Sequence, residues 1–320
     1  MVIPYLQLFF GFLVLIKGAD FLVKGATSIA RRLKISDLVI GLTVVAFGTS
    51  SPELFVNIAS SIKGNTDISI GNVLGSNIAN VFLILGVSSI IYPLTVTKGT
   101  IWKEIPFSLM AALIMGIMAN DQIIDKVGFS ILSRIDGLVL LSFFIIFMYY
   151  SFSIAKKIEG MEDHMPLVQF GLLKSFSIAI LGLIGLTIGG ELIVRGAVSI
   201  SLQFEISQSL VGLTIVAIGT SLPELATSAV AAWKRNVEIA VGNVVGSNIF
   251  NIFFVLGMSS VIKPLPFYAK YNGDVITAIG ANLILFLFMF TGEKRLLDRW
   301  EGGALIFLYG CYLWILFTKG

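Results

Sequence analysis

The sequence is poor in charged residues, in cysteine and in histidine. Of its 320 residues, 13% are charged and 56% are hydrophobic, and it contains one cysteine, Cys311, and one histidine, His164. A single cysteine excludes a disulfide framework, and a thiolate or imidazole metal site needs several such ligands. With a mean hydropathy of +0.94, the chain is too apolar for an ordinary water-soluble domain. The composition predicts an integral protein of the lipid bilayer.

The net charge of +3 is small, and the basic residues lie in short loops instead of forming a stripe. No nucleic-acid partner is therefore expected. Alternate loops differ, with roughly 12 Lys and Arg on one side against about 6 on the other, and basic loops face the cytoplasm. The richer side holds Arg31, Arg32, Lys34, Lys156, Lys157, Lys234 and Arg235. We expect a multi-pass protein of the cell membrane with both termini outside.

Apolar segments recur along the whole chain. Ten of them begin near residues 3, 38, 69, 104, 135, 167, 209, 238, 273 and 302. Segments of roughly 18 to 25 residues are long enough to cross about 30 Å of hydrocarbon as α-helices. A membrane β-barrel would need strict apolar–polar alternation, which residues 138–148 lack. The predicted fold class is all-α, integral membrane, with ten transmembrane helices.

The two halves of the chain repeat one another. GLTVVAFGTSSPEL at 41–54 recurs as GLTIVAIGTSLPEL at 212–225, and GNVLGSNIAN at 71–80 recurs as GNVVGSNIFN at 242–251. The second copy of each motif lies 171 residues after the first. A constant offset over two motifs indicates a duplicated architecture, which chance does not produce.

Each half holds five membrane segments, so the second half enters the membrane from the opposite side. Inverted repeats with interrupted helices at matching positions are typical of secondary transporters, which bind substrate between the halves. We expect a first five-helix repeat at 1–155, a cytoplasmic connector at 156–166 and a second, inverted five-helix repeat at 167–320.

Each repeat places small, hydroxyl and acidic residues at positions i, i+3, i+4 and i+7 of an apolar segment, along one face of a helix. These residues are Ala46, Thr49, Ser50 and Glu53 in the first repeat, and Ala217, Thr220, Ser221 and Glu224 in the second. A charge at the centre of a membrane helix costs about 2.5 to 3.5 kcal/mol by insertion scales. The two glutamates therefore require a partner that offsets this cost.

Proline follows shortly after a glycine in both motifs. Pro52 and Pro223 lack an N–H, so the carbonyls of Gly48 and Gly219 lose their helical donors and the helix unwinds more easily. Neighbouring segments add polar residues spaced by four, namely Asn72, Ser76 and Asn80, and Asn243, Ser247 and Asn251. Freed carbonyls and these side chains would line one cage of oxygen atoms.

Carboxylates, hydroxyls, amides and carbonyls form a hard-oxygen ligand set, which suits Ca²⁺ or Na⁺ better than Zn²⁺ or Cu⁺. Glu53 and Glu224 would neutralise one divalent ion, which favours calcium as a substrate. No cofactor is implied. The i,i+4 pairs Asp20–Lys24 and Glu191–Arg195 are expected to be structural ion pairs.

These residues carry a resemblance to the calcium/cation antiporter superfamily, in its sodium/calcium exchanger branch. The most specific parts are GTSSPE at 48–53 and GTSLPE at 219–224, each followed by its GNV motif. The resemblance implies alternating access, in which the first and sixth segments slide across a rigid core. It implies calcium binding by Glu53 and Glu224 with the backbone oxygens of Thr49 and Thr220. It also implies sodium sites, which we expect to be formed by Ala46, Thr49, Ser50, Glu53, Ser76, Asn80, Ala217, Thr220, Ser221, Glu224, Ser247 and Asn251.

Other functions compete with sodium/calcium exchange. Some relatives, the potassium-dependent ones in particular, carry an acid where this chain has Asn251, whereas Asn80 and Asn251 are both neutral here. That difference argues against potassium cotransport. Proton/calcium exchange, a passive cation channel and a membrane hydrolase with two acids are the remaining alternatives. The two equivalent sets of hydroxyl, amide and carbonyl oxygens favour a carrier and argue against an enzyme.

Overall fold

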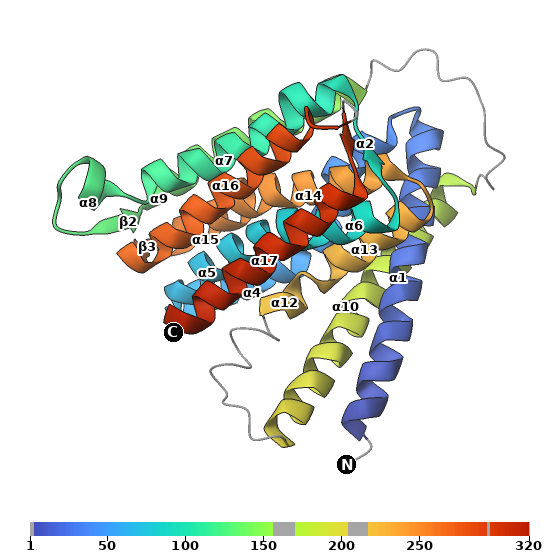
Figure 1. Cartoon of the computed structure of the whole chain (residues 1–320), viewed down its shortest axis with the longest axis horizontal. Coiled ribbons are helices and arrows are strands. Elements are labelled where there is room, and N and C mark those ends of the chain that lie inside the picture. The colour runs from blue at the N-terminus through green and yellow to red at the C-terminus, as the bar shows by residue number, and fades with distance from the viewer. Residues whose placement is uncertain (1–2, 156–169, 204–216, 293–294, 320) are drawn as a thin grey trace.

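The computed structural model describes residues 3–155, 170–203, 217–292 and 295–319. The predicted connector 156–166 therefore lies outside the described residues, as does His164. Within the described ranges the structure is almost entirely helical (Figure 1), so the prediction of an all-α protein is confirmed.

The helices follow the predicted segments closely. The first half contains α1 (Ile3–Leu33), α2 (Asp37–Ile40), α3 (Ala46–Thr49), α4 (Ser51–Lys63), α5 (Thr66–Ala79), α6 (Gly86–Ile91), α7 (Ile105–Met118), α8 (Asp121–Ile124) and α9 (Arg134–Ala155). The second half contains α10 (Leu172–Gln203), α12 (Ala217–Thr220), α13 (Leu222–Trp233), α14 (Val237–Phe250), α15 (Gly257–Ile262), α16 (Asn272–Phe288) and α17 (Arg299–Lys319). A 3₁₀ turn, η6, covers Ala269–Tyr271.

Eight helices in the described ranges are long and apolar enough to cross a membrane, or nine if the bent pair 37–49 and 51–63 is one span. The predicted segment that begins near residue 209 starts outside the described residues and continues as α12 and α13. Large apolar side chains on the outer helices face outward, among them Ile135, Tyr149 and Phe307. These exposed faces suit contact with lipid.

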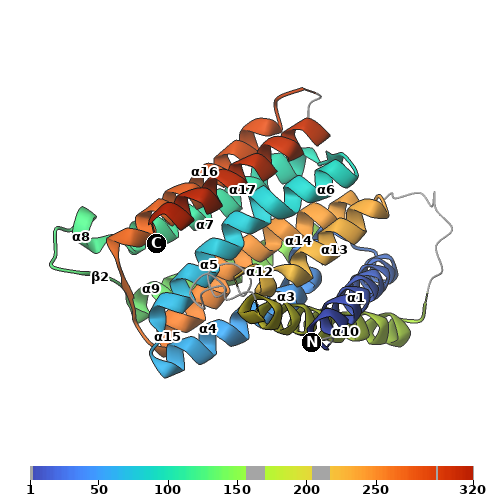
Figure 2. The ribbon, with the colours of Figure 1, turned by 60° about the horizontal axis from the view of Figure 1, so that its bottom comes forward.

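Helices α1 and α10 form an antiparallel pair beside the other helices (Figures 1 and 2). Glycines recur every seven residues along their contact. A Cβ atom added to Gly18 would lie 2.6 Å from the Leu186 nitrogen, and one added to Gly25 would lie 2.6 Å from the Ala179 nitrogen. Backbones that approach this closely tolerate only glycine. The glycines therefore hold α1 and α10 together as a unit.

The two GNV motifs form the centre of the remaining helices. They lie on α5 and α14, and on α14 every residue from Ile239 to Phe250 is buried. Helices α3, α13 and α7 pack against α14, and α4 and α16 pack against α5. Apart from the half-buried Asn72, the polar residues of both motifs are enclosed by protein, where a membrane protein can accommodate them.

Short strands tie the two repeats together at their ends. Strand β1 (Leu94–Thr95) pairs with β4 (Leu296–Leu297), and β2 (Ser130–Leu132) pairs with β3 (Leu265–Phe267), both antiparallel. Each pair joins one strand of the first half to one of the second half. The pairing therefore fixes the halves against each other outside the helical core.

In the ranges that the structure describes, four π-helical turns interrupt the spans, a feature that the sequence analysis did not predict. They are η1 (Gly41–Val45), η2 (Asn80–Leu85), η3 (Thr100–Glu104) and η5 (Asn251–Leu256). Turns η2 and η5 begin at Asn80 and Asn251, equivalent positions of the two repeats. Such turns are rare and often occur at functional sites. Here η2 directly follows α5 and η5 directly follows α14, so the helical geometry changes at the last asparagine of each GNV motif.

Candidate cation site

The helix that carries each glutamate is broken one turn before it. Helix α3 ends at Thr49 and α4 begins at Ser51, with a bend of 45° between the two halves of this span. Ser50 between them has φ −83° and ψ 5°, and its equivalent Ser221 has φ −86° and ψ 2°. The predicted unwinding beside the prolines is confirmed. The prediction that Ala46 to Glu53 share one continuous helical face is wrong, because the chain turns at Ser50.

The break places both glutamates in the first turn of a new helix. Pro52 and Pro223 occupy the opening positions of α4 and α13, where a missing N–H costs nothing. Glu53 and Glu224 follow directly, at the positive end of the helix dipole. Each proline therefore both interrupts one helix and starts the next in a position that favours a carboxylate.

The two carboxylates are buried and close enough to interact electrostatically. Glu53 is 0% exposed and Glu224 is 1% exposed. The hydroxyl of Thr220 lies near the Glu53 carboxylate, and those of Ser50 and Thr49 lie near the Glu224 carboxylate, so each acid faces hydroxyls of the opposite repeat. The Ser50 hydroxyl donates to Glu224 Oε1 at 2.9 Å. Thr220 and Ser76 are hydroxyl residues near Glu53, yet within the described ranges neither Glu53 oxygen has a donor in hydrogen-bonding geometry.

Both threonines use their hydroxyls to bind the opposite repeat. Thr49 Oγ1 donates to Asn243 Oδ1 at 3.0 Å, and Thr220 Oγ1 donates to Asn72 Oδ1 at 3.3 Å. The two bonds are equivalent under the repeat. Because the hydroxyls are engaged with asparagine, the threonines would offer a cation their backbone oxygens, as the resemblance implies.

The remaining predicted hydroxyls differ between the repeats. Ser221 Oγ lies 3.2 Å from Ser76 Oγ, while the buried Ser247 hydroxyl has no hydrogen-bond partner among the residues described. Ala46 is fully buried, and its carbonyl accepts the Ser50 N–H at 2.9 Å. Its equivalent Ala217 begins α12, and the side chain of Ala217 lies outside the described residues.

Asn80 and Asn251 are held by two asparagines that the sequence analysis did not single out. Asn80 Nδ2 donates to Asn248 Oδ1 at 2.9 Å, and Asn251 Nδ2 lies 3.5 Å from Asn77 Oδ1. Asn77 and Asn248 are the asparagines of the SNI sequence in both GNV motifs. Their recurrence at the same offset was the available signal.

Several buried oxygen atoms around the glutamates have no hydrogen-bond partner among the described residues. They are Glu53 Oε1 and Oε2, Glu224 Oε2, Asn80 Oδ1, Asn251 Oδ1 and Ser247 Oγ. Unsatisfied buried polar atoms are rare and costly in proteins. Asn72 Nδ2 is also buried without a partner among these residues, and it would face away from a cation. The oxygens, which include those of two carboxylates, fit a hard cation such as Ca²⁺ or Na⁺.

Two other buried acids lie elsewhere and have structural partners. Glu301 accepts the Asp298 N–H at 2.8 Å at the start of α17, and Glu104 bonds to the Tyr150 hydroxyl. In the described part of the chain, no group of three or more His, Cys, Asp and Glu residues lies together. Glu53 and Glu224 are therefore the acidic pair available to a bound cation.

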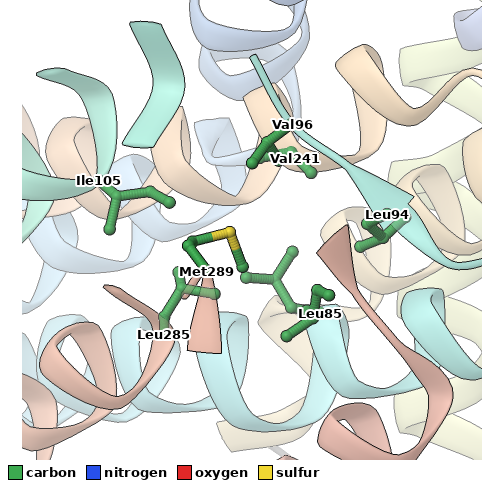
Figure 3. A pocket seen from close by; sticks show the side chains of 8 residues that line it. Leu85, Leu94, Val96, Ile105, Val241, Leu285 and Met289 are labelled. Atoms are coloured by element: carbon green, nitrogen blue, oxygen red, sulfur yellow. The ribbon is translucent and has the colours of Figure 1, made fainter. Parts of the chain in front are cut away.

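A small cavity elsewhere in the core is apolar and is no candidate for the ion site (Figure 3). It has a volume of about 10 Å³. Its lining consists of Leu85, Leu94, Val96, Ile105, Val241, Leu285, Met289 and Leu297. Aliphatic side chains cannot coordinate a cation, and the Met289 thioether is a soft ligand that does not suit Ca²⁺ or Na⁺. We therefore interpret this space as a packing defect.

The fold and the site define a class of protein. Two equivalent broken helices that each bring a buried carboxylate to one shared oxygen-lined site, inside a polytopic membrane protein, are the architecture of a secondary transporter. The family model described as sodium/calcium exchanger protein matches residues 3–153 and 174–318. The chain belongs to this family.

Similar proteins cover nearly the whole chain. The sodium/calcium exchanger MaX1 of Methanosarcina acetivorans is 33% identical over 349 residues, covering 98% of this chain and 99% of the relative. The inner membrane protein YrbG of Escherichia coli is 36% identical over 262 residues, covering 79% and 78%. A structure of the sodium-calcium exchanger NCX_Mj, soaked with 10 mM Na⁺ and zero Ca²⁺, matches with a TM-score of 0.84 at 35% identity, covering 98% of both chains.

These matches confirm the predicted family and the architecture of ten membrane helices in two inverted repeats. The ion-binding roles of the individual residues remain predictions. Of the predicted set, the structure joins Ser50 to Glu224 and Ser221 to Ser76, and it places Thr220 and Ser76 near Glu53.

Proposed function

We propose that this chain exchanges Na⁺ for Ca²⁺ across the cell membrane by alternating access. The observation that carries the proposal is the group of buried, unpartnered oxygens around Glu53 and Glu224, where two broken helices meet. Relatives named as sodium/calcium exchangers support it. The activity is transport driven by ion gradients, for which the protein needs neither a catalytic residue nor a cofactor.

Calcium would bind between the two carboxylates. Glu53 and Glu224 supply two negative charges, which neutralise one divalent ion, and Thr49 and Thr220 supply backbone oxygens beside them. An unpartnered carboxylate in a buried site is costly, and a divalent cation offsets that cost directly. Both Glu53 oxygens, which have no donor, are the strongest candidates for calcium contact.

Sodium would use an overlapping set of ligands. Glu53, Glu224, Thr49 and Thr220 are shared with calcium. The further ligands are Ala46, Ser50, Ser76, Asn80, Ala217, Ser221, Ser247 and Asn251. Because the carboxylates are shared, Na⁺ and Ca²⁺ compete for one site, and binding of one favours release of the other. Competition for shared carboxylates is the physical basis of exchange.

The orientation of the protein follows from its basic loops. The side that holds Arg31, Arg32 and Lys234 would face the cytoplasm, which places both termini outside. On this assignment 1–155 and 167–320 are the two inverted repeats, and 156–166 is a cytoplasmic connector. Antibody access to tags at each end of the chain in intact cells tests this orientation.

The alternatives differ in the ion that drives transport. Potassium dependence is disfavoured because Asn80 and Asn251 leave the site with two carboxylates. A passive channel is disfavoured because the glutamates are fully buried and the site is enclosed by protein. Proton exchange on the same two glutamates is the remaining competitor, since a carboxylate binds protons as well as cations.

Calcium uptake into vesicles that contain the purified protein distinguishes these functions. Sodium, proton and potassium gradients are imposed one at a time, and uptake is expected to follow the outward sodium gradient. Dependence on the proton gradient alone would assign the chain to proton exchange, and uptake that ignores all three gradients would indicate a channel.

The variant Glu53→Gln keeps the shape of the side chain and removes its charge. We expect it to abolish sodium-driven calcium uptake, because one carboxylate cannot neutralise a buried divalent ion. Glu301→Gln removes a buried carboxylate that caps α17, away from the proposed site, and serves as the control for folding and insertion. Undiminished uptake by Glu53→Gln would contradict the assigned site.

A further inference from the structure

Asn77 and Asn248 connect the two repeats directly beside the proposed sodium ligands. Asn77 lies on α5 and Asn248 on α14, three residues before Asn80 and Asn251 respectively. The hydrogen bonds cross between the repeats: Asn248 binds Asn80, and Asn77 binds Asn251. All four side chains are buried.

The bonds determine which way the amides point. Asn77 Nδ2 lies 3.4 Å from the backbone oxygen of Asn248, and a carbonyl can only accept a hydrogen bond. Asn77 therefore presents its Oδ1 atom to Asn251. Since Oδ1 also can only accept, Asn251 must present its Nδ2 atom. The amide oxygen of Asn251 is thereby turned away from Asn77, and it is buried with no hydrogen-bond partner among the residues that the structure describes.

The other repeat shows the same pairing of amides, although no corresponding bond to the Asn77 carbonyl accompanies it among the described residues. Asn80 Nδ2 donates to Asn248 Oδ1 at 2.9 Å, and the buried Asn80 oxygen likewise has no partner in the described part of the chain. When the NH₂ group of an amide donates to another protein group, its oxygen is left to accept a hydrogen bond or to coordinate a cation. A cation is attracted to such an oxygen, whereas the NH₂ end of the same amide would repel it.

We propose that Asn77 and Asn248 are positioning residues that orient Asn251 and Asn80 with their oxygens toward bound sodium. The inference rests on the proposed function, because it assumes that Asn80 and Asn251 contact sodium. Both ligands are neutral amides, so the charge of the site is that of Glu53 and Glu224. Loss of a positioning asparagine lets the neighbouring amide rotate, and sodium then loses a preorganised ligand.

A purely structural role for these bonds predicts a different outcome. If Asn77 and Asn248 only hold α5 and α14 together, their loss lowers stability without selective effect on one ion. Asn282 supplies the matched control. It is a buried asparagine outside the site, which accepts from the Ser108 hydroxyl at 2.8 Å and donates to the Ala278 carbonyl at 2.9 Å.

The experiment is a set of double-mutant cycles on sodium-driven calcium uptake in vesicles. Single variants are Asn77→Leu, Asn248→Leu, Asn80→Ala and Asn251→Ala. Each is expected to raise the sodium concentration for half-maximal exchange about fivefold, the effect of one neutral hydrogen bond or ligand, with little change in that for calcium. Asn282→Leu is expected to leave both concentrations unchanged.

The crossed pairing makes the cycles specific. Asn77→Leu should add nothing further once Asn251 is alanine, and Asn248→Leu should add nothing further once Asn80 is alanine. The mismatched combinations, Asn77→Leu with Asn80→Ala and Asn248→Leu with Asn251→Ala, should multiply their effects. The smaller polar substitutions Asn77→Ser and Asn248→Ser replace the leucine variants if these do not fold.

Two results would overturn the inference, and they are distinguishable. Multiplicative effects in the crossed pairs, or an equal loss of sodium and calcium affinity in Asn77→Leu, would leave the asparagines with a structural role alone. Unchanged sodium affinity in Asn80→Ala and Asn251→Ala would instead remove these two residues from the ligand set of the proposed function.

Discussion

Equivalent residues of the two repeats make different contacts in the site. Ser50 donates to Glu224 Oε1 at 2.9 Å, whereas its counterpart Ser221 lies 3.2 Å from Ser76. Glu224 thus has a hydroxyl donor, whereas neither oxygen of Glu53 has one among the described residues. A nearly symmetric sequence therefore produces an asymmetric site. We expect the two carboxylates to differ in how tightly each is held when no cation is bound.

Replacing Ser50 tests this asymmetry. Ser50→Ala removes the donor to Glu224, and a hydrogen bond to a charged group contributes about 1.5 to 3 kcal/mol. We expect the calcium concentration for half-maximal uptake to rise at least roughly tenfold. The adjacent Ser51 donates to the Phe47 carbonyl at 2.8 Å, so Ser51→Ala is the control. Equal effects in both variants would show that the bond to Glu224 contributes nothing specific.

At the scale of helices, glycine and proline have separate functions. Proline breaks the two helices that carry the glutamates and starts the next helix at Ser51 and at Leu222. Glycine lets α1 and α10 approach closely along their length. The family resemblance implies that these two helices slide across the core. Because their backbones interlock, they would move as one unit.

Gly18→Val tests the interlocking of α1 and α10. Its new Cβ atom would lie 2.6 Å from the Leu186 nitrogen, and because the neighbour is backbone, the helices must separate. Overpacking of this kind costs about 1 to 3 kcal/mol. We expect a lower unfolding temperature in detergent and loss of exchange. Gly310→Val on α17, where a Cβ atom meets nothing within 4 Å, should leave both unchanged.

At the scale of the whole molecule, the two ends of the site differ. Asp20 binds Lys24 at 2.7 Å and also forms an ion pair with Lys234, which joins α1 to the end of α13. The equivalent residues, 171 positions away, are Glu191, Arg195 and Lys63. Glu191 binds Arg195 at 2.6 Å, so both predicted i,i+4 pairs are confirmed. In the described part of the chain, no ion pair joins Glu191 to Lys63.

Asn236 reinforces the end that holds Lys234. Its Nδ2 atom donates to Asp37 Oδ2 at 2.7 Å and to Thr27 Oγ1 at 3.1 Å. The equivalent Asn65 precedes α5 without a side-chain cap. Burial lowers the pKa of Lys234, and its bond to Asp20 acts in the opposite direction. Asn236 thus links the start of α14 to α1 and α2 at this end. The residue equivalent to Asp37 lies outside the described ranges, and the other end is joined to η6 by the ion pair of Asp67 with Lys270.

Lys234→Met tests this difference between the ends. An ion pair that is partly exposed contributes about 0.2 to 1 kcal/mol, so amide hydrogen exchange around residues 233–236 should accelerate by up to about fivefold. Lys63→Met removes the equivalent charge at the other end and should change exchange there little, because Lys63 is exposed and unlinked to Glu191. Equal acceleration at both ends would contradict the proposed asymmetry.

Much of this protein was predictable from the sequence by itself. Long apolar segments report membrane helices because the bilayer imposes their length and composition. The repeated motifs identified Glu53 and Glu224 and the prolines beside them, since a duplicated polar face in an apolar chain is a strong one-dimensional signal. Family, fold class and the ion pairs within single helices followed from the same local patterns.

The tertiary structure alone decided how the two repeats meet. The crossed bonds of Asn77 and Asn248, the π-helical turns at Asn80 and Asn251, and the donation of Ser50 to Glu224 depend on residues about 170 positions apart. Because the two repeats have nearly the same sequence, the sequence predicts the same role for both copies of a residue. Packing in one conformation gives the copies different neighbours, so the asymmetry between Glu53 and Glu224, and between the two ends of the site, exists only in three dimensions.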